Sequence, residues 1–371
     1  MGIANFILPF IVLITVVVFI HEYGHYYFAK KFGVGITDFS IGFGKEIFGW
    51  KDKTGTRWKI CWIPLGGYVK FFGDRNVFSQ AEQEEIVKKY SETERNKLFI
   101  LKPLYQRALV VAAGPIANFI LAIFIFSFIY MFSGKDLTPA VISEVQKDSP
   151  AFIAGLKKND QILLIDNNKV DSIMQVSTFI TASTNEIIKF TILRDNQNKV
   201  LNVKPNYVES TDSLGNKINK RMVGIKLSSF NDEINHVKLG PTKAIYYAGK
   251  EVIFVSISTL KYIGSMFRGS GDSSQLGGPI RIAKITGQVA ELGLLPFLSV
   301  MAYISISLGL INLFPIPMLD GGHLMFYGIE KVLGHPLSQK VQEGFFRIGM
   351  FLLLSLMFFT TFNDIKDLGL F

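Results

Sequence analysis

The sequence predicts a polytopic α-helical membrane protein with about four spanning helices, a β-hairpin in its first loop and one inserted α+β domain. The composition is the first reason: 49% of the 371 residues are hydrophobic, 33 are Phe, and the mean hydropathy is +0.31. Soluble domains are rarely so apolar. The second reason is that several apolar runs reach the length needed to cross about 30 Å of hydrocarbon. The third is a long, more polar stretch between two of these runs, which contains the turn signals of a folded domain.

Four apolar runs are long enough to form spanning helices. We expect these helices at residues 4–29, 107–132, 296–314 and 345–362. A cleaved signal peptide begins with a charged segment, but the leading MGIAN contains no Lys or Arg. No small-residue cleavage site follows the first run either, so we expect this helix to be retained.

The distribution of cations predicts the orientation in the membrane. Residues 30–107 contain fifteen Lys and Arg, whereas the N-terminal tail contains none. Because cationic loops stay in the cytoplasm, we expect the first loop to be cytoplasmic, and the two termini and the segment 133–295 to be extracytoplasmic. The same rule accounts for the net charge of +9, and the chain has none of the nucleic-acid-binding motifs.

RWKICWIPLGGYVKFFG, residues 57–73, predicts a β-hairpin in the first loop. Its aromatic and β-branched residues favour strands, and the central Leu65-Gly66-Gly67 is typical of a glycine turn. The segment is too short to span as a helix and too apolar for an exposed loop. Non-helical backbone is tolerated inside a bilayer only where it lines a protein cavity. A hairpin that dips into the membrane is therefore expected to border such a cavity.

The extracytoplasmic segment begins with a compact domain. SPAFIAGLKKNDQILLIDNNKV predicts a short helix that ends at Gly155, a turn at Asn159-Asp160, a strand and a second turn. The polar residues 206–220 predict a loop at the domain edge. The chain is thus divided into a first membrane part, a domain with its core at 137–206, an extracytoplasmic helical linker and a second membrane part, at 1–132, 133–225, 226–295 and 296–371.

Residues 241–268 leave the number of spans open. Lys243, Lys250 and Lys261 interrupt apolar runs of about ten residues, which is short for a span. We favour a helix that lies on the outer membrane surface. A fifth span is the alternative, and it would reverse the third predicted helix relative to the first.

HEYGH, at the inner end of the first helix, is a candidate metal site. Residues four apart lie on one face of a helix, so His21 and His25 can present imidazole nitrogens to one zinc ion. Glu22 is turned by about 100° from His21, which suits a general base beside the metal. If hydrocarbon ends near Lys30, the histidines lie about 7 and 13 Å below its surface, where ionisable groups are costly unless they bind something. The alternative, an interfacial belt of His and Tyr, leaves Glu22 unexplained.

INLFPIPMLDGGHL, at the end of the third helix, offers a further ligand. A zinc hydrolase site needs a third protein ligand and one open position, and the only cysteine, Cys61, excludes a Cys-rich site. Asp320 follows two helix-breaking prolines and precedes Gly321-Gly322, which permits a close backbone approach. We favour Asp320 as a carboxylate ligand. A helix N-cap is the alternative role for Asp320, and His323 is the competing ligand.

Asn312 is a polar residue at membrane depth in the third helix. Its amide has both a donor and an acceptor, so it can bind a substrate backbone or stabilise an oxyanion. A hydrogen bond to a neighbouring helix is the alternative. Gly114-Pro115 and Asn118 break the second helix in a similar way, and packing against the site is the role we expect for them.

Three motifs in this order resemble the site-2 protease family of intramembrane zinc metalloproteases: HEYGH in the first helix, GPIAN in the second and NLFPIPMLDGGH in the third. FSIGFGKEIF, IPLGGYVK, SPAFIAGLKKNDQI and GPIRIAKITGQVAELG are similar to the branch known as the bacterial regulator of sigma-E protease. The resemblance covers nearly the whole chain. It implies one zinc ion per chain, bound by His21, His25 and Asp320, with Glu22 as the catalytic base.

The resemblance also implies the surroundings of the site. Asn312 and Pro315 are expected near bound substrate, and the hairpin at 57–73 is expected to be membrane-reentrant. Residues 137–206 are expected to form a PDZ domain. Such domains usually have Gly-Asp where this chain has Asn159-Asp160, and Asn tolerates the positive φ of that turn. The best-known members have two tandem PDZ domains, whereas 133–240 has room for about one.

The function implied is zinc-dependent cleavage of the transmembrane segments of single-span membrane proteins in regulated intramembrane proteolysis. Anti-sigma factors and signal-peptide remnants are the expected substrates, and the bacterial inner membrane is the expected location, with the active site in its cytoplasmic half. We expect an unwound substrate to add as a strand at the hairpin edge, at Leu65, Gly66, Gly67 and Tyr68. The PDZ-like domain is expected to bind a peptide or a C-terminus.

A PDZ-bearing membrane scaffold or a zinc transporter with a structural metal site is the alternative. A transporter needs further intramembrane carboxylates or histidines along its path, and the second and fourth helices have none. A scaffold has no use for Glu22.

Overall fold

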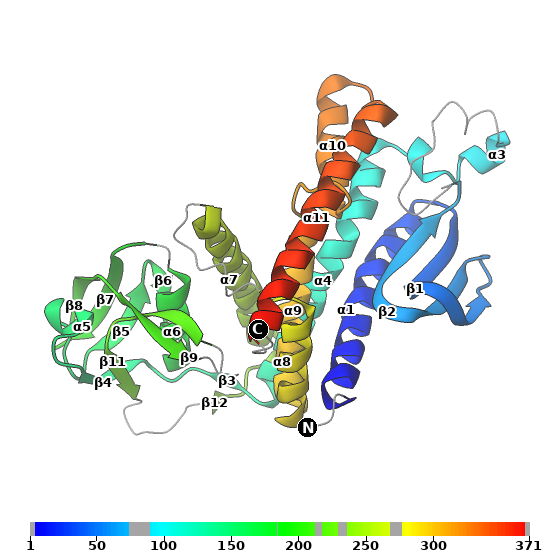
Figure 1. The fold of residues 1–371 in the computed structure, drawn as a ribbon. Coiled ribbons are helices and arrows are strands. Elements are labelled where there is room, and N and C mark those ends of the chain that lie inside the picture. The colour runs from blue at the N-terminus through cyan, green and yellow to red at the C-terminus, as the bar shows by residue number, and fades with distance from the viewer. Residues whose placement is uncertain are drawn as a thin grey trace. The chain divides into compact units, whose positions relative to one another are not determined.

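The computed structural model describes residues 4–73, 90–183, 185–211, 217–228, 236–267 and 277–367. The chain forms two compact units, one of residues 1–125 with 277–371 and one of residues 126–276 (Figure 1). We call them the helical unit and the sheet unit. The helix α4 begins in the first and ends in the second.

The helical unit contains most of the long helices and one small sheet. Its elements are α1 (Ala4–Lys31), β1 (Ile36–Lys51), β2 (Arg57–Phe71), α3 (Glu92–Arg95), the 3-10 helix η1 (Phe99–Leu101), α4 (Leu104–Phe132), α8 (Pro279–Glu291), α9 (Leu294–Asn312), α10 (Asp320–Leu333) and α11 (Gln339–Asp367).

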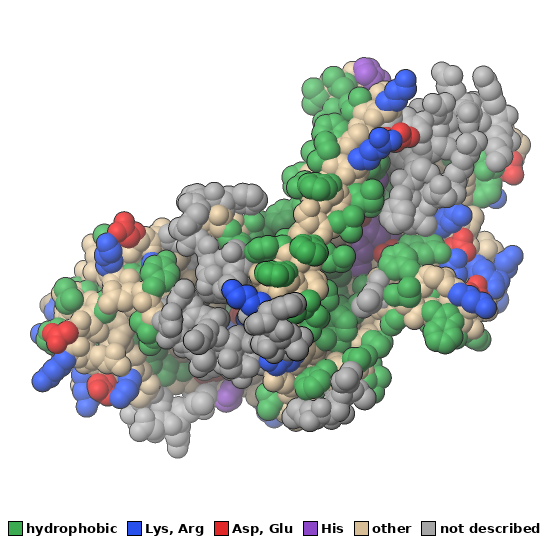
Figure 2. Space-filling model, viewed as in Figure 1, with side chains coloured by type: hydrophobic (Ala, Val, Ile, Leu, Met, Phe, Trp, Pro, Cys, Tyr) green, Lys and Arg blue, Asp and Glu red, His purple; other side chains and the backbone are tan. Residues whose placement is uncertain are grey.

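Four helices in the described ranges are long and apolar enough to cross a membrane. They lie at Phe6–Lys31, Leu104–Phe132, Leu294–Asn312 and Lys340–Lys366, and they correspond to the four predicted spans. The last is longer than predicted, because α11 continues to Asp367 through the polar residues that follow its apolar run. Figure 2 shows hydrophobic side chains at the surface of the molecule. On α11, Phe351 and Phe358 are exposed, as expected of a helix that faces lipid.

The predicted hairpin at 57–73 is wrong in its turn. Residues 57–71 form the single strand β2, which pairs antiparallel with β1. The chain reverses earlier, between Asp52 and Thr56, where Gly55 has a φ of +89°. Gly66 does have a positive φ, of +115°, but it lies where the register of the two strands shifts. The glycine pair therefore serves a bulge and a close approach, which sequence does not distinguish from a turn.

In the β1–β2 sheet, one part of β1 pairs with two different parts of β2. Residues 38–41 of β1 have partners at 67–70 on one side and at 57–60 on the other, and 48–51 also pair with 57–60. Among the described strands, 67–70 pair on one side only, so this part of β2 is an edge. The sheet packs on α1 through aromatic rings: Trp58 stacks on Phe39 with centroids 4.2 Å apart, and Tyr26 of α1 meets Trp58 at 5.1 Å.

The sheet unit has a sheet of order β11-β4-β5-β7-β8, with β6 paired to β5, and two further strand pairs, β9 with β10 and β3 with β12. Its elements are β3 (Lys135–Asp136), β4 (Val141–Val145), α5 (Pro150–Ile153), β5 (Gln161–Ile165), β6 (Asn168–Lys169), α6 (Ile173–Ala182), β7 (Ile188–Arg194), β8 (Gln197–Val203), β9 (Asn206–Thr211), β10 (Lys217–Met222), β11 (Ile225–Ser228), β12 (His236–Val237) and α7 (Pro241–Phe267).

The core of the sheet unit confirms the local turn predictions. The short helix α5 is followed by Gly155 with a φ of +82°, and Asn159 has a φ of +70°, so asparagine does take the left-handed conformation here. The fully buried Ile142, Ile162 and Phe190 pack with α6 in one core. The predicted loop at 206–220 is wrong for its described residues, which form the β9–β10 hairpin. Tyr207, Val208 and Ile218 are residue types that favour strands.

The helix at 241–267 is continuous but is not among the helices apolar enough to span. Within the sheet unit this helix packs on α6, where Phe254 meets Phe179 with ring centroids 4.8 Å apart.

Candidate metal centre

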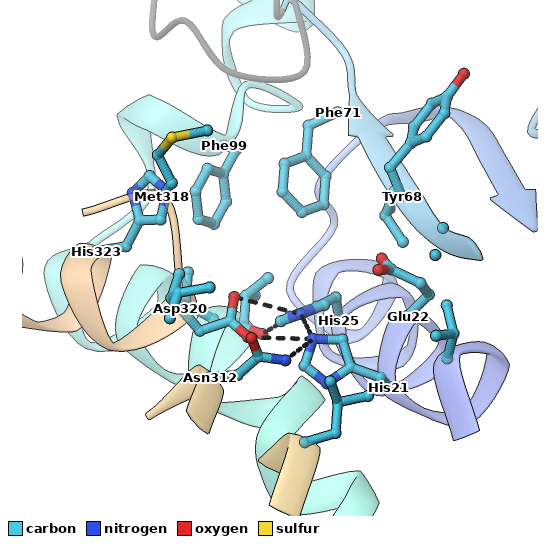
Figure 3. A pocket seen from close by; sticks show the side chains of 18 of the residues that line it. His21, Glu22, His25, Tyr68, Phe71, Phe99, Asn312, Met318, Asp320 and His323 are labelled. Atoms are coloured by element: carbon cyan, nitrogen blue, oxygen red, sulfur yellow. Dashed lines mark hydrogen bonds and ion pairs between the residues drawn. The ribbon is translucent and has the colours of Figure 1, made fainter. Parts of the chain in front are cut away.

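The two histidines of α1 meet at one point. His21 and His25 are one helical turn apart, and their Nε2 atoms lie 3.2 Å from each other. The helix breaker Pro9 lies far toward the N-terminus of α1, so the turn that carries HEYGH is regular. Figure 3 shows both rings directed to the same side of α1. Both histidines line one cavity.

Asp320 brings a carboxylate to the same point. The prolines at 315 and 317 end α9, and α10 begins at Asp320 with Leu319 in the N-cap position. Asp320 is therefore in the first turn and is not the cap. Its Oδ2 lies 3.2 Å from Nε2 of His21, and its Oδ1 lies 3.5 Å from Nε2 of His25. Among the described residues, these three side chains form the one cluster with metal-ligand spacing.

The glycines after Asp320 permit this approach. A β-carbon on Gly322 would lie 2.7 Å from Cα of Pro317 and closer still to the carbonyl of Ile316. Gly321 faces the carbonyls of Leu313 and Phe314 in the same way. Only residues without a side chain fit where α10 folds back on the loop that precedes it.

The spacing of the three ligands fits a zinc ion. Two ligand atoms that each lie about 2.1 Å from a tetrahedral zinc are about 3.4 Å apart. The distances here are 3.2, 3.2 and 3.5 Å. Nδ1 of His25 lies 2.9 Å from the carbonyl oxygen of Val110. Since a carbonyl only accepts, Nδ1 carries the proton and Nε2 is left as a lone-pair donor. The three side chains could thus offer two imidazole nitrogens and a carboxylate oxygen to one metal ion.

Glu22 lies beside the three ligands without joining them. Figure 3 shows its carboxylate on the side of the cavity formed by β2, apart from the point where the histidines and Asp320 meet. Gly67, Tyr68 and Val69 of β2 line the cavity beside it. A carboxylate in this place can accept a proton from a water in the cavity.

The edge of β2 forms the opposite wall of the cavity. Gly66, Gly67 and Tyr68 all line it. A β-carbon on Gly67 would lie 3.0 Å from Val18 and 3.1 Å from Cγ of Glu22, so glycine is what allows the strand to approach α1 this closely. Of Leu65, the structure describes the backbone within β2 and not the side chain.

Of the remaining predicted residues, Asn312 lies near the histidines, whereas His323 and Pro315 do not. Asn312 reaches the ligands, with Nδ2 3.4 Å from Nε2 of His21. His323 lines the cavity but lies apart from the ligand cluster (Figure 3). Its ring lies near those of Phe326 and Phe346, and burial lowers the pKa of its imidazole. Pro315 is exposed and is not among the residues that line the cavity.

The helix α4 supplies contacts that sequence reasoning assigned to packing. Asn118 is fully buried, and its Nδ2 position lies 3.2 Å from Nδ1 of His21. A β-carbon on Gly114 would overlap the imidazole of His25 and come within 2.9 Å of that of His21. A glycine and a buried amide four residues apart in an apolar helix were the available signal, but nothing in the sequence names their partners.

The cavity has a volume of about 440 Å³. It is large enough for several residues of an extended peptide and is mainly apolar away from the ligands. The apolar part of the lining includes Val18, Phe43, Phe71, Phe99, Leu308 and Phe346, which come from six different elements.

Known proteins resemble this chain along nearly its whole length. The chain matches peptidase family M50 over residues 9–356. A presumed zinc metalloprotease of Agrobacterium fabrum is 41% identical, over 98% of this chain and 96% of the relative. Metalloprotease MmpA of Caulobacter vibrioides is 34% identical, over 97% of this chain and 95% of the relative.

Among solved structures, the PDZ domain of an SdrC-like protein from Listeria monocytogenes is similar to a part of the chain. The identity is 22%, the TM-score is 0.20, and the likeness covers 24% of this chain and 87% of that domain. A TM-score this low supports no conclusion about the fold. The family match and the relatives at 34–41% identity do support one: the chain belongs to peptidase family M50, the site-2 proteases, and it is a peptidase.

Proposed function

We propose that this peptidase is a zinc-dependent intramembrane endopeptidase, with one zinc ion held by His21, His25 and Asp320. One observation carries the proposal: three ligand atoms from helices at opposite ends of the chain converge at 3.2–3.5 Å. They do so in a unit whose helices are apolar enough to cross a membrane. The zinc metalloprotease name of the Agrobacterium relative supports the choice of metal.

Glu22 is the proposed general base. Zinc bound at this site would act as a Lewis acid on the scissile carbonyl and lower the pKa of water. The Glu22 carboxylate takes the proton of the attacking water and delivers it to the nitrogen of the leaving amine. Its place on the cavity wall next to the ligands, but outside their cluster, supports this role.

Asn312 is proposed to bind the substrate carbonyl. Its Nδ2 lies 3.4 Å from Nε2 of His21, so the amide is within reach of a group bound at the metal. A neutral N–H donor there stabilises the charge that develops on the carbonyl oxygen. Pro315 acts less directly, since it ends α9 and so sets the position of Asp320.

The substrate is proposed to bind as a strand along the edge of β2. A helical substrate hides its peptide bonds, so it must unwind, and lipid cannot satisfy the backbone groups that unwinding frees. Residues 67–70 pair on one side only among the described strands, and Gly66, which follows Leu65 in β2, also lines the cavity. Hydrogen bonds to that edge replace those of the substrate helix.

Exposed apolar side chains support a membrane-reentrant position for the β1–β2 sheet. Phe48, Trp50, Trp62 and Ile63 are all about half or more exposed. Such a patch is stable in hydrocarbon and unfavourable in water. The proposed orientation is that of the cation count, with the site in the cytoplasmic half of the bacterial inner membrane and both termini and the sheet unit outside.

The substrates are proposed to be single-span membrane proteins, such as anti-sigma factors and signal-peptide remnants, cut in regulated intramembrane proteolysis. The sheet unit, proposed to be one PDZ-like domain, selects them by the peptide or C-terminus of their outer portion. The helix α7 is proposed to lie on the outer surface of the membrane, because Ile253, Ile257 and Leu260 are exposed on it while Lys250 folds over Tyr246.

The test compares variants of the full chain in detergent or liposomes with a spanning peptide as substrate. Glu22→Gln is expected to keep zinc and to lose cleavage by about 100-fold or more. His21→Ala and Asp320→Asn are expected to lose zinc, and His323→Ala to keep it. Full cleavage by Glu22→Gln would refute the base assignment. Loss of zinc in His323→Ala, with its retention in Asp320→Asn, would replace the third ligand.

A further inference from the structure

The helix α4 contacts both histidines of the proposed zinc site at their Nδ1 atoms. The carbonyl oxygen of Val110 lies 2.9 Å from Nδ1 of His25, and the amide of Asn118 lies 3.2 Å from Nδ1 of His21. Residues 110, 114 and 118 are spaced by four and so share one face of α4. Gly114, between the two contacts, lets the helix approach both rings.

The contact to His25 fixes its tautomer without ambiguity. A backbone carbonyl cannot donate, so Nδ1 of His25 bears the proton, and Nε2 has a free lone pair. That lone pair points to the place where Asp320 and His21 meet it. Outer hydrogen bonds of this kind orient a ligand and raise its basicity.

The contact to His21 admits two arrangements, because an amide has a donor and an acceptor end. With Nδ2 toward the ring, Nδ1 of His21 accepts and Nε2 bears the proton. That proton points at Nε2 of His25, 3.2 Å away, and His21 cannot ligate a metal. In the same arrangement, Oδ1 of Asn118 is buried with no hydrogen-bond partner among the described residues. Rotating the amide by 180° exchanges the two atoms and places Oδ1 on the ring.

We propose that Asn118 is a positioning residue whose Oδ1 accepts the Nδ1 proton of His21 and thereby keeps Nε2 bare for zinc. The proposal rests on the zinc ligands proposed above. Asn118 is fully buried, and its backbone carbonyl accepts a hydrogen bond of 2.8 Å from the hydroxyl of Ser305 in α9. Gly309 of α9 packs against its β-carbon. The amide is thus held at the ring by contacts that do not involve the metal.

Zinc affinity tests this assignment directly. The full chain in detergent is titrated with a chromophoric chelator at fixed pH, and affinity is compared across variants. Asn118→Leu has a similar volume and no acceptor, and its zinc affinity is expected to fall by about 10- to 100-fold. Asn118→Asp can only accept when ionised, and its affinity is expected to stay within about threefold of the parent or to rise. Ser127→Ala removes a buried polar atom of α4 that has no partner among the described residues, and it is expected to change nothing.

The tautomer of His21 gives a second readout that packing alone would not move. In zinc-loaded protein with ¹⁵N-labelled histidine, the His21 resonances are expected to show a protonated Nδ1. They are identified by their loss in His21→Ala. Asn118→Asp is expected to preserve this pattern and Asn118→Leu to lose it in the fraction that still binds zinc.

The outcomes separate the two proposals. Retention of zinc by His21→Ala overturns the ligand set, and the role of Asn118 with it. Loss of zinc by His21→Ala, with unchanged affinity in Asn118→Leu, overturns the role of Asn118 alone. An equal loss in Asn118→Asp and Asn118→Leu also overturns it, because it shows that the amide donates. If Asn118→Leu does not fold, Asn118→Asp alone distinguishes the two arrangements. Its zinc affinity is kept if residue 118 accepts a hydrogen bond from His21, and falls if residue 118 donates one.

Discussion

Gly114 of α4 lies against the ring of His25: a β-carbon on residue 114 would overlap Nε2 and Cε1 of that ring. Nε2 is a proposed zinc ligand, and Nδ1 of the same ring donates a hydrogen bond to the carbonyl of Val110 on α4. The ring therefore cannot move away without leaving the site.

Gly114→Ala is expected to lose zinc and cleavage together, even though alanine favours a helix by about 1 kcal/mol over glycine. The measurement is zinc bound per chain after dialysis. Gly328→Ala in α10 is the matched control, because nothing lies within 4 Å of a β-carbon there. The control is expected to keep zinc and to be slightly more stable. Zinc at parental stoichiometry and affinity in Gly114→Ala would contradict the close packing of α4 on the ligands.

Gly67→Val is expected to separate cleavage from metal binding. A β-carbon at residue 67 meets Val18, Glu22 and the carbonyl of Ser40 within 3.1 Å, so a larger side chain pushes the β2 edge away from α1. The zinc ligands do not touch this residue. We expect zinc content to be unchanged and kcat/KM on a spanning peptide to fall by about 10-fold or more. Parental kcat/KM would show that the β2 edge has no part in holding the substrate.

Asp52 anchors the turn between β1 and β2. Its carboxylate accepts hydrogen bonds from the Thr54 and Thr56 amides, from Nε1 of Trp58 and from the hydroxyl of Tyr26 in α1. Burial alone would raise the pKa of Asp52, but these hydrogen bonds outweigh it and hold the pKa below its usual range. Asp52→Ala is expected to lower the unfolding midpoint at pH 7 by about 2–4 °C.

The pH dependence of this effect has a definite sign. Because the pKa of Asp52 is lowered in the folded chain, its stabilisation is present above the unfolded value of about 3.9 and is lost as pH falls below it. The difference between parent and Asp52→Ala is therefore expected to be constant from pH 6 to 8 and to shrink below about pH 4. The exposed Lys53→Ala is the control. A difference that grows on acidification would exclude this role for the carboxylate.

Asp364 near the end of α11 caps α8. Its buried carboxylate accepts hydrogen bonds from the amides of Gly278, Ile280 and Arg281 at 2.8–3.0 Å. Asp364→Ala leaves these amides without their acceptor, so α8 is expected to open more often, with tryptic cleavage at Arg281 or Lys284 faster by about 2- to 30-fold. Lys366→Ala is the control. An unchanged cleavage rate at both sites would show that the Asp364 carboxylate does not hold α8 in place.

The sequence predicts those parts of the site that depend on local geometry. The spacing of His21 and His25 implies one helix face whatever surrounds it, and the helix breakers before Asp320 imply a short acidic turn. Apolar length likewise predicts the four spans. Asn159 in the left-handed turn follows from the backbone preference of a single residue.

The parts that the sequence does not predict depend on distant partners. The glycine pair at 66 and 67 resembles a turn because glycine is used both for positive φ and for close approach, and only the contact with α1 tells them apart. The role of Asn118 is hidden for the same reason. It is 97 residues from His21 along the chain, and an amide in an apolar helix gives no sign of what it touches.

The division of the ligands between α1 and α10 has a consequence for biosynthesis. His21 and His25 emerge from the ribosome first, and Asp320 follows 295 residues after His25. A chain still being made, or one cut short, has two imidazoles and lacks the carboxylate that completes the set. With the proposed ligand set, zinc binding, and with it cleavage of other proteins, is expected only after α10 has been made.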